Sequence, residues 1–311
     1  MLDRLLEEDE LEVAAVSGTS AGALNAVALA SGWRQGGREG ARAALSRLWR
    51  TVAREASRTP LHLGSLAAFG FGLATYLFSP YELNPLNINP LRDLLNELVD
   101  FKALRASSPM PILIAATQVR SAQARLFREH EVTAETILAS ACLPQIHHAI
   151  EIEGEAYWDG GFVSNPPVVE LARLGRSRTL LVLRINPAVA HDLPRSAAGI
   201  RNRTTEVVFG QPLANELAQL ERIRKLDRGG LLGWLRPELR RLARLEVEVI
   251  DGDETLLGLD PITKVAPDRL LLDRLHADGR AAAAAWLERR AAPGLNLPRG
   301  QLTGTAARHA A

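Results

Sequence analysis

The chain has 311 residues, enough for one large domain or two small ones, and 47% of them are hydrophobic, so it can bury a substantial core. Its 37 Lys and Arg against 36 Asp and Glu leave a net charge of +1, which gives no general attraction for nucleic acid. The single cysteine, Cys142, excludes an internal disulfide framework and a zinc site built from several cysteines. We therefore expect a globular, cytoplasmic protein without a nucleic-acid partner.

The chain begins with strand-like and helix-like runs in alternation. Residues 1–10 are acidic and amphipathic, resemble the end of a helix and do not resemble a secretory signal. Residues 11–16 (LEVAAV) predict a short strand, and residues 21–31 predict a helix of small residues that ends at Gly32. Residues 39–58 carry apolar side chains at helical spacing and predict a long amphipathic helix.

The most apolar stretch spans residues 61–78 and is bounded by Pro60 and Pro80. It is short and interrupted by glycines, which argues against a membrane span. We expect it to form a lid or to make peripheral contact with a membrane surface.

The rest of the chain continues the alternation, with a mobile tail expected after residue 292. The predicted elements are a helix at 91–99, a strand at 111–119, a helix at 133–141, a hairpin at 151–158, a strand at 179–185, a helix at 203–226, a strand at 245–250, and helices at 268–275 and 280–292. This order predicts an α/β fold with a mostly parallel sheet covered by helices.

Ser20 lies in a G-x-S-x-G sequence between the first predicted strand and the helix that follows. Such an elbow strains the serine backbone and exposes its Oγ, and Gly18 and Gly22 would remove side chains that collide in the turn. The N–H of Ala21, at the start of the helix, could stabilise an oxyanion during acyl transfer. The alternative is a plain turn in which Ser20 only caps the helix.

A serine hydroxyl needs a base, and Asp159 is the leading candidate. It follows the predicted hairpin and precedes Gly160 and Gly161, which support a tight turn from which a carboxylate projects. Burial that raises its pKa would help it accept the serine proton directly. The alternative is that Asp-Gly-Gly is an ordinary turn.

A Ser-acid-His triad would need a histidine late in the chain. His191, His276 and His309 come late enough, but none lies in a recognisable motif. His147 and His148 could line a cleft, although no spacing supports a metal role. We expect Cys142 to be a buried packing residue, because no basic neighbour would activate it.

Three motifs together resemble those of the patatin-like phospholipase family: G-T-S-A-G at residues 18–22, A-S-A-C-L-P at 139–144, and Y-W-D-G-G-F-V-S-N-P-P at 157–167. The resemblance extends over about residues 11–187. It implies a three-layer α/β/α fold, a Ser20–Asp159 dyad that needs no metal or cofactor, and cleavage of phospholipids or related acyl esters.

The resemblance also suggests a division of the chain and a departure from the family pattern. We expect an acyl hydrolase domain over 1–250, a helical extension over 251–292 and a tail over 293–311. Patatin-like proteins usually carry a strand and a G-G-G-x-R/K-G loop before the elbow, yet no glycine precedes Gly18. Residues 36–40 (GGREG) favour a loop between two helices instead.

Two hypotheses account for this departure. In the first hypothesis, which we favour, the sequence is shortened and its true start lies upstream. In the second, the protein is a variant that binds lipid with weak or no hydrolase activity. Both predict the same fold, and they differ in catalysis, because losing an oxyanion donor costs about 100-fold to 1,000-fold in rate.

Overall fold

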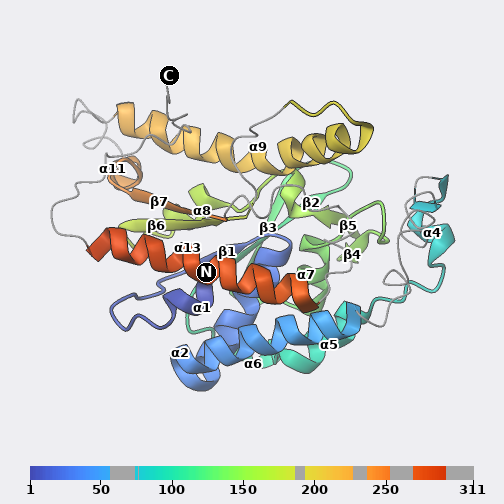
Figure 1. Cartoon of the computed structure of the whole chain (residues 1–311), viewed down its shortest axis with the longest axis horizontal. Helices are drawn as coiled ribbons and strands as arrows, with labels where there is room; N and C mark the ends of the chain where they lie inside the picture. The colour runs from blue at the N-terminus through green and yellow to red at the C-terminus, as the bar shows by residue number, and fades with distance from the viewer. Residues whose placement is uncertain (57–73, 76, 186–192, 227–236, 253–268, 292–311) are drawn as a thin grey trace.

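The computed structural model describes residues 1–56, 74–75, 77–185, 193–226, 237–252 and 269–291. In Figure 1 the strands lie between helices, with α9 along one side and α2, α5 and α6 along the other. No helix within the described ranges is long and apolar enough to cross a membrane. The helices are α1 (Leu2–Leu5), α2 (Ala21–Ala56), α4 (Pro80–Leu83), α5 (Pro90–Leu98), α6 (Phe101–Ala106), α7 (Ala134–Ser140), α8 (Val168–Arg173), α9 (Ala197–Leu226), α11 (Pro237–Ala243) and α13 (Arg269–Ala291).

The main sheet is mixed, which corrects the prediction of a mostly parallel sheet. β2 is its centre, and it pairs in parallel with β1 and antiparallel with β3 and β5, while β4 pairs antiparallel with β5. A second sheet holds β6 and β7 in parallel. The strands are β1 (Val16–Gly18), β2 (Ile112–Gln118), β3 (Ala124–Arg128), β4 (Ile150–Ile152), β5 (Glu155–Asp159), β6 (Thr179–Arg184) and β7 (Glu246–Asp251).

Two hairpins produce two of the three antiparallel pairs, and the third pair joins β2 to β5. The hairpin predicted around Gly154 is confirmed as β4 and β5, joined through Glu153 and Gly154, both with positive φ. The second, between β2 and β3, was not expected, and its turn contains Ala122 with φ of 54°. Because a short turn can join only antiparallel neighbours, these hairpins set strand directions that the alternating pattern did not reveal.

Several predicted elements are confirmed with shifts of a few residues at their ends. The helix at 91–99 corresponds to α5 and the strand at 111–119 to β2. The helix at 133–141 is α7, which begins after Thr133, whose side chain accepts a hydrogen bond from the Thr136 N–H as a capping residue does. Likewise the predicted strands at 179–185 and 245–250 correspond to β6 and β7.

The first strand and the helix after it differ from the prediction. β1 covers Val16–Gly18, whereas residues 11–15, expected to be strand, have no ladder partner among the described strands. Gly32 does not end α2, because the non-helical residues are Gly36 and Gly37. A Cβ on Gly32 would collide with the Gly40 carbonyl, so this glycine allows the two halves of α2 to lie close together.

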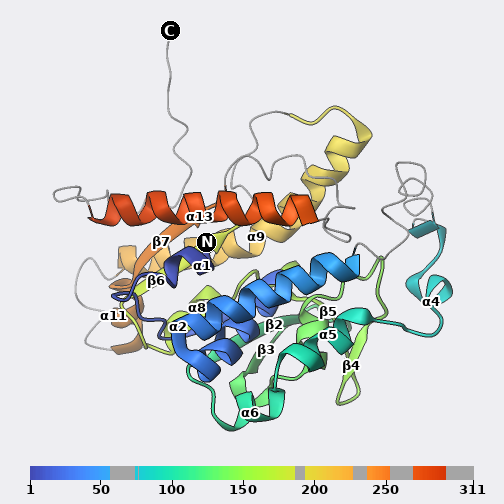
Figure 2. The same cartoon turned by 60° about the horizontal axis from the view of Figure 1, so that its bottom comes forward.

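The last two predicted helices form one helix, α13, and the predicted gap between residues 275 and 280 is wrong. A Cβ on Gly279 would lie 2.8 Å from the backbone nitrogen of Met1, so this residue gives the N-terminus room against the helix. Figure 2 shows α1 beside α13, and Asp3 forms ion pairs there with Arg42 of α2 and Arg280 of α13. The predicted tail and most of the apolar stretch at 61–78 lie outside the described residues.

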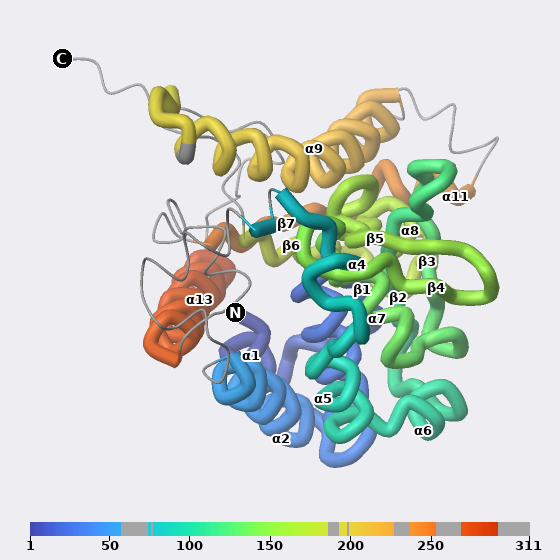
Figure 3. Tube along the Cα trace, turned by 90° about the vertical axis from the view of Figure 1, so that its right-hand side faces the viewer, coloured from blue at the N-terminus to red at the C-terminus, as the bar shows by residue number. Residues whose placement is uncertain are grey.

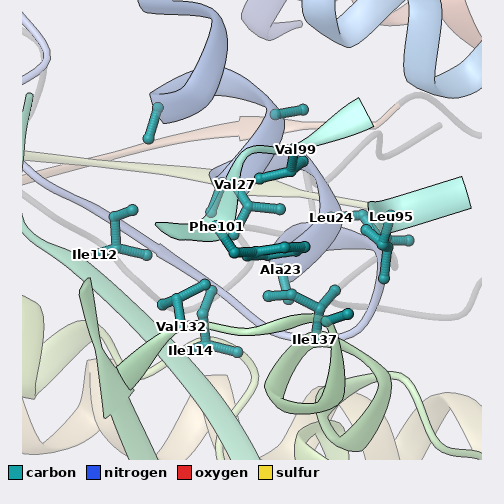
Figure 4. Close-up of a cluster of buried hydrophobic side chains, with 14 of the residues drawn as sticks. Ala23, Leu24, Val27, Leu95, Val99, Phe101, Ile112, Ile114, Val132 and Ile137 are labelled. Carbon is teal, nitrogen blue, oxygen red and sulfur yellow. The ribbon is translucent and has the colours of Figure 1, made fainter. Parts of the chain in front are cut away.

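The largest cluster of buried side chains joins α2 to the central strand (Figure 4). Ala23 and Val27 of α2 lie in this cluster with Ile112 and Ile114 of β2, and each is fully buried. Burial of large aliphatic side chains contributes about 1.5–3 kcal/mol each. The beginning of α2, immediately after Ser20, is therefore held firmly against the sheet.

Candidate active site

The strand ends bring the two predicted catalytic residues to one edge of β2. β1 pairs with Ile112–Ile114 and β5 with Ala116–Gln118, and β3 pairs with residues that overlap both sets. A strand has only two edges, so β1 and β5 share the edge opposite β3. β1 runs along it in one direction and β5 in the other, and the two meet at Ala115.

The residues at the meeting point are next to the predicted dyad. Gly18 is paired with Ile114 and Asp159 with Ala116, so Thr19 and Gly160 both lie at Ala115. A Cβ on Gly160 would collide with the Ala115 carbonyl and would lie 2.9 Å from Cγ2 of Thr19. Gly160 is therefore needed for the close approach of the two chains, as predicted for this turn.

Ser20 has the backbone conformation of a strained elbow. Its φ is 55°, a region that residues other than glycine rarely adopt. A Cβ on Gly18 would collide with the backbone of Gly22 and Ala23, so Gly18 is required by space. Gly22 is different, because nothing lies within 4 Å of a Cβ placed there. The expectation that Gly22 prevents a collision is wrong.

The N–H groups around Ser20 leave one donor free at the start of α2. The Gly22 N–H donates to the Thr19 carbonyl, and the Ala23 N–H donates to the Ser20 carbonyl. Within the described part of the chain, no hydrogen bond engages the Ala21 N–H. The Ser20 N–H donates to Oγ of Ser140 at 3.0 Å. Among the described N–H groups at the start of α2, that of Ala21 therefore remains available to donate to an oxyanion.

Asp159 is completely buried at the end of β5. Its Oδ1 accepts a hydrogen bond from the Gly161 N–H at 2.7 Å, and its carbonyl accepts one from Oγ1 of Thr117 at 2.7 Å. Burial raises the pKa of the carboxyl from its usual 3.8 to about 6, against smaller lowering effects of the Ser20 hydroxyl and the Gly161 N–H. A carboxyl with this pKa can both accept and return a proton near neutral pH.

The second carboxylate oxygen of Asp159, Oδ2, is buried and lacks a hydrogen-bond partner among the described residues. The Ser20 hydroxyl is near enough to lower the pKa of this carboxyl, yet the two groups do not meet strict hydrogen-bond geometry. Catalytic hydrogen bonds are often long before substrate binds. An orphaned buried oxygen costs stability, which favours a functional role for it.

Gly161 gives room to a ring from a distant helix. A Cβ there would collide with the ring of Phe209 in α9 and would lie 3.0 Å from Oδ1 of Asp159. The centroid of the Phe209 ring also lies 4.9 Å from the centroid of the Phe162 ring. Both glycines after Asp159 are thus required by close packing.

The described histidines form no hydrogen bond with the predicted dyad. His276 contacts Oδ2 of Asp3 at 3.2 Å, while His148 contacts the Pro80 carbonyl at 3.0 Å. His191 and His309 lie outside the described residues.

Cys142 is buried beside the acid turn. Its thiol donates to the His148 carbonyl at 3.0 Å, and its own carbonyl accepts from the Asp159 N–H at 2.8 Å. Burial raises the pKa of this thiol to about 12, so it stays protonated and unreactive at neutral pH.

The comparisons with known proteins agree with the motifs. The model of a family described as patatin-like phospholipase matches residues 1–172, more than half of the chain. The chain belongs to the patatin-like phospholipase family. No curated protein matches the chain in sequence. The family match indicates lipid hydrolase activity and lipid substrates, and the matched residues extend from α1 into α8.

Sequence reasoning missed the residues that support the elbow and the acid turn. Ser140 is fully buried and holds the Ser20 N–H, and Thr117 holds the Asp159 carbonyl. Thr19 donates its hydroxyl hydrogen to the Ser164 carbonyl at 2.8 Å. Ser140 and Ser164 lie inside the motifs at 139–144 and 157–167, so their small polar side chains in otherwise apolar surroundings were the available signal.

Proposed function

We propose that this protein is a serine-dependent lipid acyl hydrolase in which Ser20 is the nucleophile and Asp159 is the base. One observation carries the proposal: Ser20, with φ of 55°, lies just after β1, and the buried Asp159, whose pKa is raised to about 6, ends β5, where the two strands meet on one edge of β2. The family match supports lipid esters as the substrate class.

The reaction has two halves. Asp159 accepts the proton of the Ser20 hydroxyl while Oγ attacks the ester carbonyl, and the Ala21 N–H donates to the oxyanion. Asp159 then gives this proton to the departing alcohol, which leaves an acyl group on Ser20. A water attacks the acyl-enzyme, its proton passes to Asp159, and the collapse of the second intermediate returns a proton to Ser20 and releases the fatty acid.

The test combines a fluorophosphonate probe with hydrolysis of a short, water-soluble acyl ester. Ser20→Ala and Asp159→Asn should each abolish turnover, and Ser20→Ala should also abolish labelling. Ser121→Ala serves as a control, because Ser121 is exposed in the turn between β2 and β3. Full turnover by either site variant would exclude the dyad.

A second candidate function is lipid binding with weak or no catalysis. It is favoured by the oxyanion donors, because Ala21 is the one residue at the start of α2 whose N–H forms no hydrogen bond among the described residues. This candidate predicts that the folded chain binds lipid while Ser20 resists the probe. Fluorophosphonate labelling of Ser20, measured beside binding of the same folded chain to lipid vesicles, distinguishes the two candidates.

We further propose a peripheral membrane contact near the predicted stretch at 61–78, of which only residues 74–75 and 77–78 are described. Leu77 and Phe78 are 61% and 50% exposed, and they lead into α4. Large exposed apolar side chains close together favour contact with lipid. Phe78→Ser should reduce sedimentation with phosphatidylcholine vesicles, whereas Leu270→Ser on α13 should not. Equal sedimentation of all three proteins would refute this contact.

A further inference from the structure

α9 contacts the turn that carries Asp159, although it lies beyond the residues matched by the family model. Figure 3 shows α9 crossing one end of the molecule above the strands and α8. The Phe209 carbonyl accepts a hydrogen bond from the Asn165 side chain at 2.7 Å. About two helical turns further along α9, the Glu216 carboxylate accepts hydrogen bonds from the same segment.

Glu216 binds two parts of this segment at once. Its Oε1 accepts from Oγ of Ser164 at 3.1 Å, and its Oε2 accepts from the Val169 N–H at 2.8 Å. Burial raises the pKa of the carboxyl, while the bonds from Val169 and Ser164 lower it in part. Glu216 is partly buried and forms no ion pair with another described residue, which costs free energy and calls for a compensating role.

Ser164 connects Glu216 to the nucleophile. Its side chain is held by Glu216, its N–H donates to the Gly160 carbonyl at 2.8 Å, and its own carbonyl accepts from Oγ1 of Thr19 at 2.8 Å. Thr19 directly precedes Ser20, and Gly160 directly follows Asp159. Ser164 therefore lies between the elbow and the acid turn and is bonded to both.

We propose that Glu216 is a positioning residue for hydrolysis: by fixing Ser164, it sets the distance between the Ser20 elbow and the Asp159 turn. This proposal rests on the proposed function. A displacement of about 1 Å between reacting groups can cost about 100-fold in rate. Loss of the Glu216 carboxylate frees Ser164 on one side, so the Thr19 and Gly160 bonds no longer hold a fixed spacing.

The experiment compares Glu216→Ala, Glu216→Gln and Ser164→Ala with the unaltered chain. Glutamine can accept from the Val169 N–H through Oε1 and donate to Oγ of Ser164 through Nε2, so it preserves both links. Glu221→Ala is the matched control, because Glu221 lies on α9 and forms ion pairs with Arg224 and Lys225 of its own helix. Each variant is first checked for cooperative unfolding by circular dichroism.

For a short acyl ester, Glu216→Ala should lower kcat about 10-fold to 100-fold while KM changes less than about 2-fold, and should slow fluorophosphonate labelling equally. Glu216→Gln and Glu221→Ala should stay within about 3-fold of the unaltered chain. Ser164→Ala should act like Glu216→Ala, and the double variant should be no worse than either.

The outcomes separate the two proposals. If the unaltered chain neither turns over ester nor labels, the proposed function fails and this role fails with it. If the unaltered chain labels and Glu216→Ala labels at the same rate, only the role of Glu216 is refuted. A Glu216→Gln variant as slow as Glu216→Ala also refutes it. If Glu216→Ala does not fold, kcat and the labelling rate of Ser164→Ala are compared with those of Glu216→Gln, and the same criteria apply.

Discussion

Replacement of Asp159 by Asn should stabilise the fold in a pH-dependent way. Burial raises the pKa of this carboxyl from 3.8 to about 6, and a difference of this size corresponds to about 3 kcal/mol. The folded protein holds the proton more tightly than the unfolded chain, so the free energy of unfolding falls as pH rises from about 4 to about 6. Asparagine stays neutral and keeps an oxygen that accepts from the Gly161 N–H. The free energy of unfolding of the Asn variant therefore does not fall in this way as pH rises.

The assay is urea unfolding of both proteins at about pH 4, 5, 6 and 8. The stability of Asp159→Asn relative to the unaltered chain should increase by up to about 3 kcal/mol between pH 4 and pH 6 and then stay constant, while esterase activity is lost. Asp273→Asn on exposed α13 is the control, expected to change stability by less than about 1 kcal/mol at every pH. A difference between Asp159→Asn and the unaltered chain that does not vary with pH would refute the reasoning.

Three further predictions concern the same site. Ester hydrolysis should fall about 10-fold per pH unit below about pH 6, because Asp159 must be ionised to accept the serine proton, and a flat profile from pH 4 to 8 would contradict this. Gly18→Ala should destabilise the fold by about 1–3 kcal/mol through its collision with Gly22, whereas Gly22→Ala should stay within about 1 kcal/mol; equal urea midpoints would refute this contrast. Ser140→Ala should lower the free energy of unfolding by about 1–3 kcal/mol, because the Ser20 N–H loses its partner, and it should also slow probe labelling. Unchanged stability would show that this bond is dispensable.

The sequence predicted the parts of the fold that depend on local signals. Thr133 and the residues after it predict the start of α7, and continuous apolar runs locate β2 and β6. The turn at Gly154 is likewise local, because two successive residues with positive φ favour glycine. In each case neighbouring residues carry the information.

The errors arise where distant contacts decide. Gly32 was interpreted as a helix end and Gly279 lies in the predicted gap between two helices, but each lies inside a helix, at a point where another segment passes close to its Cα. Similarly, Gly22 fits the motif yet meets no neighbour, while Gly161 is required by the Phe209 ring from a helix that lies far along the chain. A glycine in a sequence does not show whether it serves a turn, a close approach or neither.

The arrangement of the candidate site depends on the antiparallel pairing of β5 with β2, which the sequence did not reveal. In a parallel sheet, Asp159 would follow a strand beside β1 and would be separated from Ser20 by the spacing between strands, about 4.8 Å, or a multiple of it. Here β5 shares an edge of β2 with β1 and approaches it from the opposite direction, so the two strands end at Ala115. The chains that carry Ser20 and Asp159 then leave the sheet at one point, where Thr19 meets Gly160. The dyad distance is therefore set by the register of two strands along β2 and by the bonds of Ser164, and a shift in either would alter it.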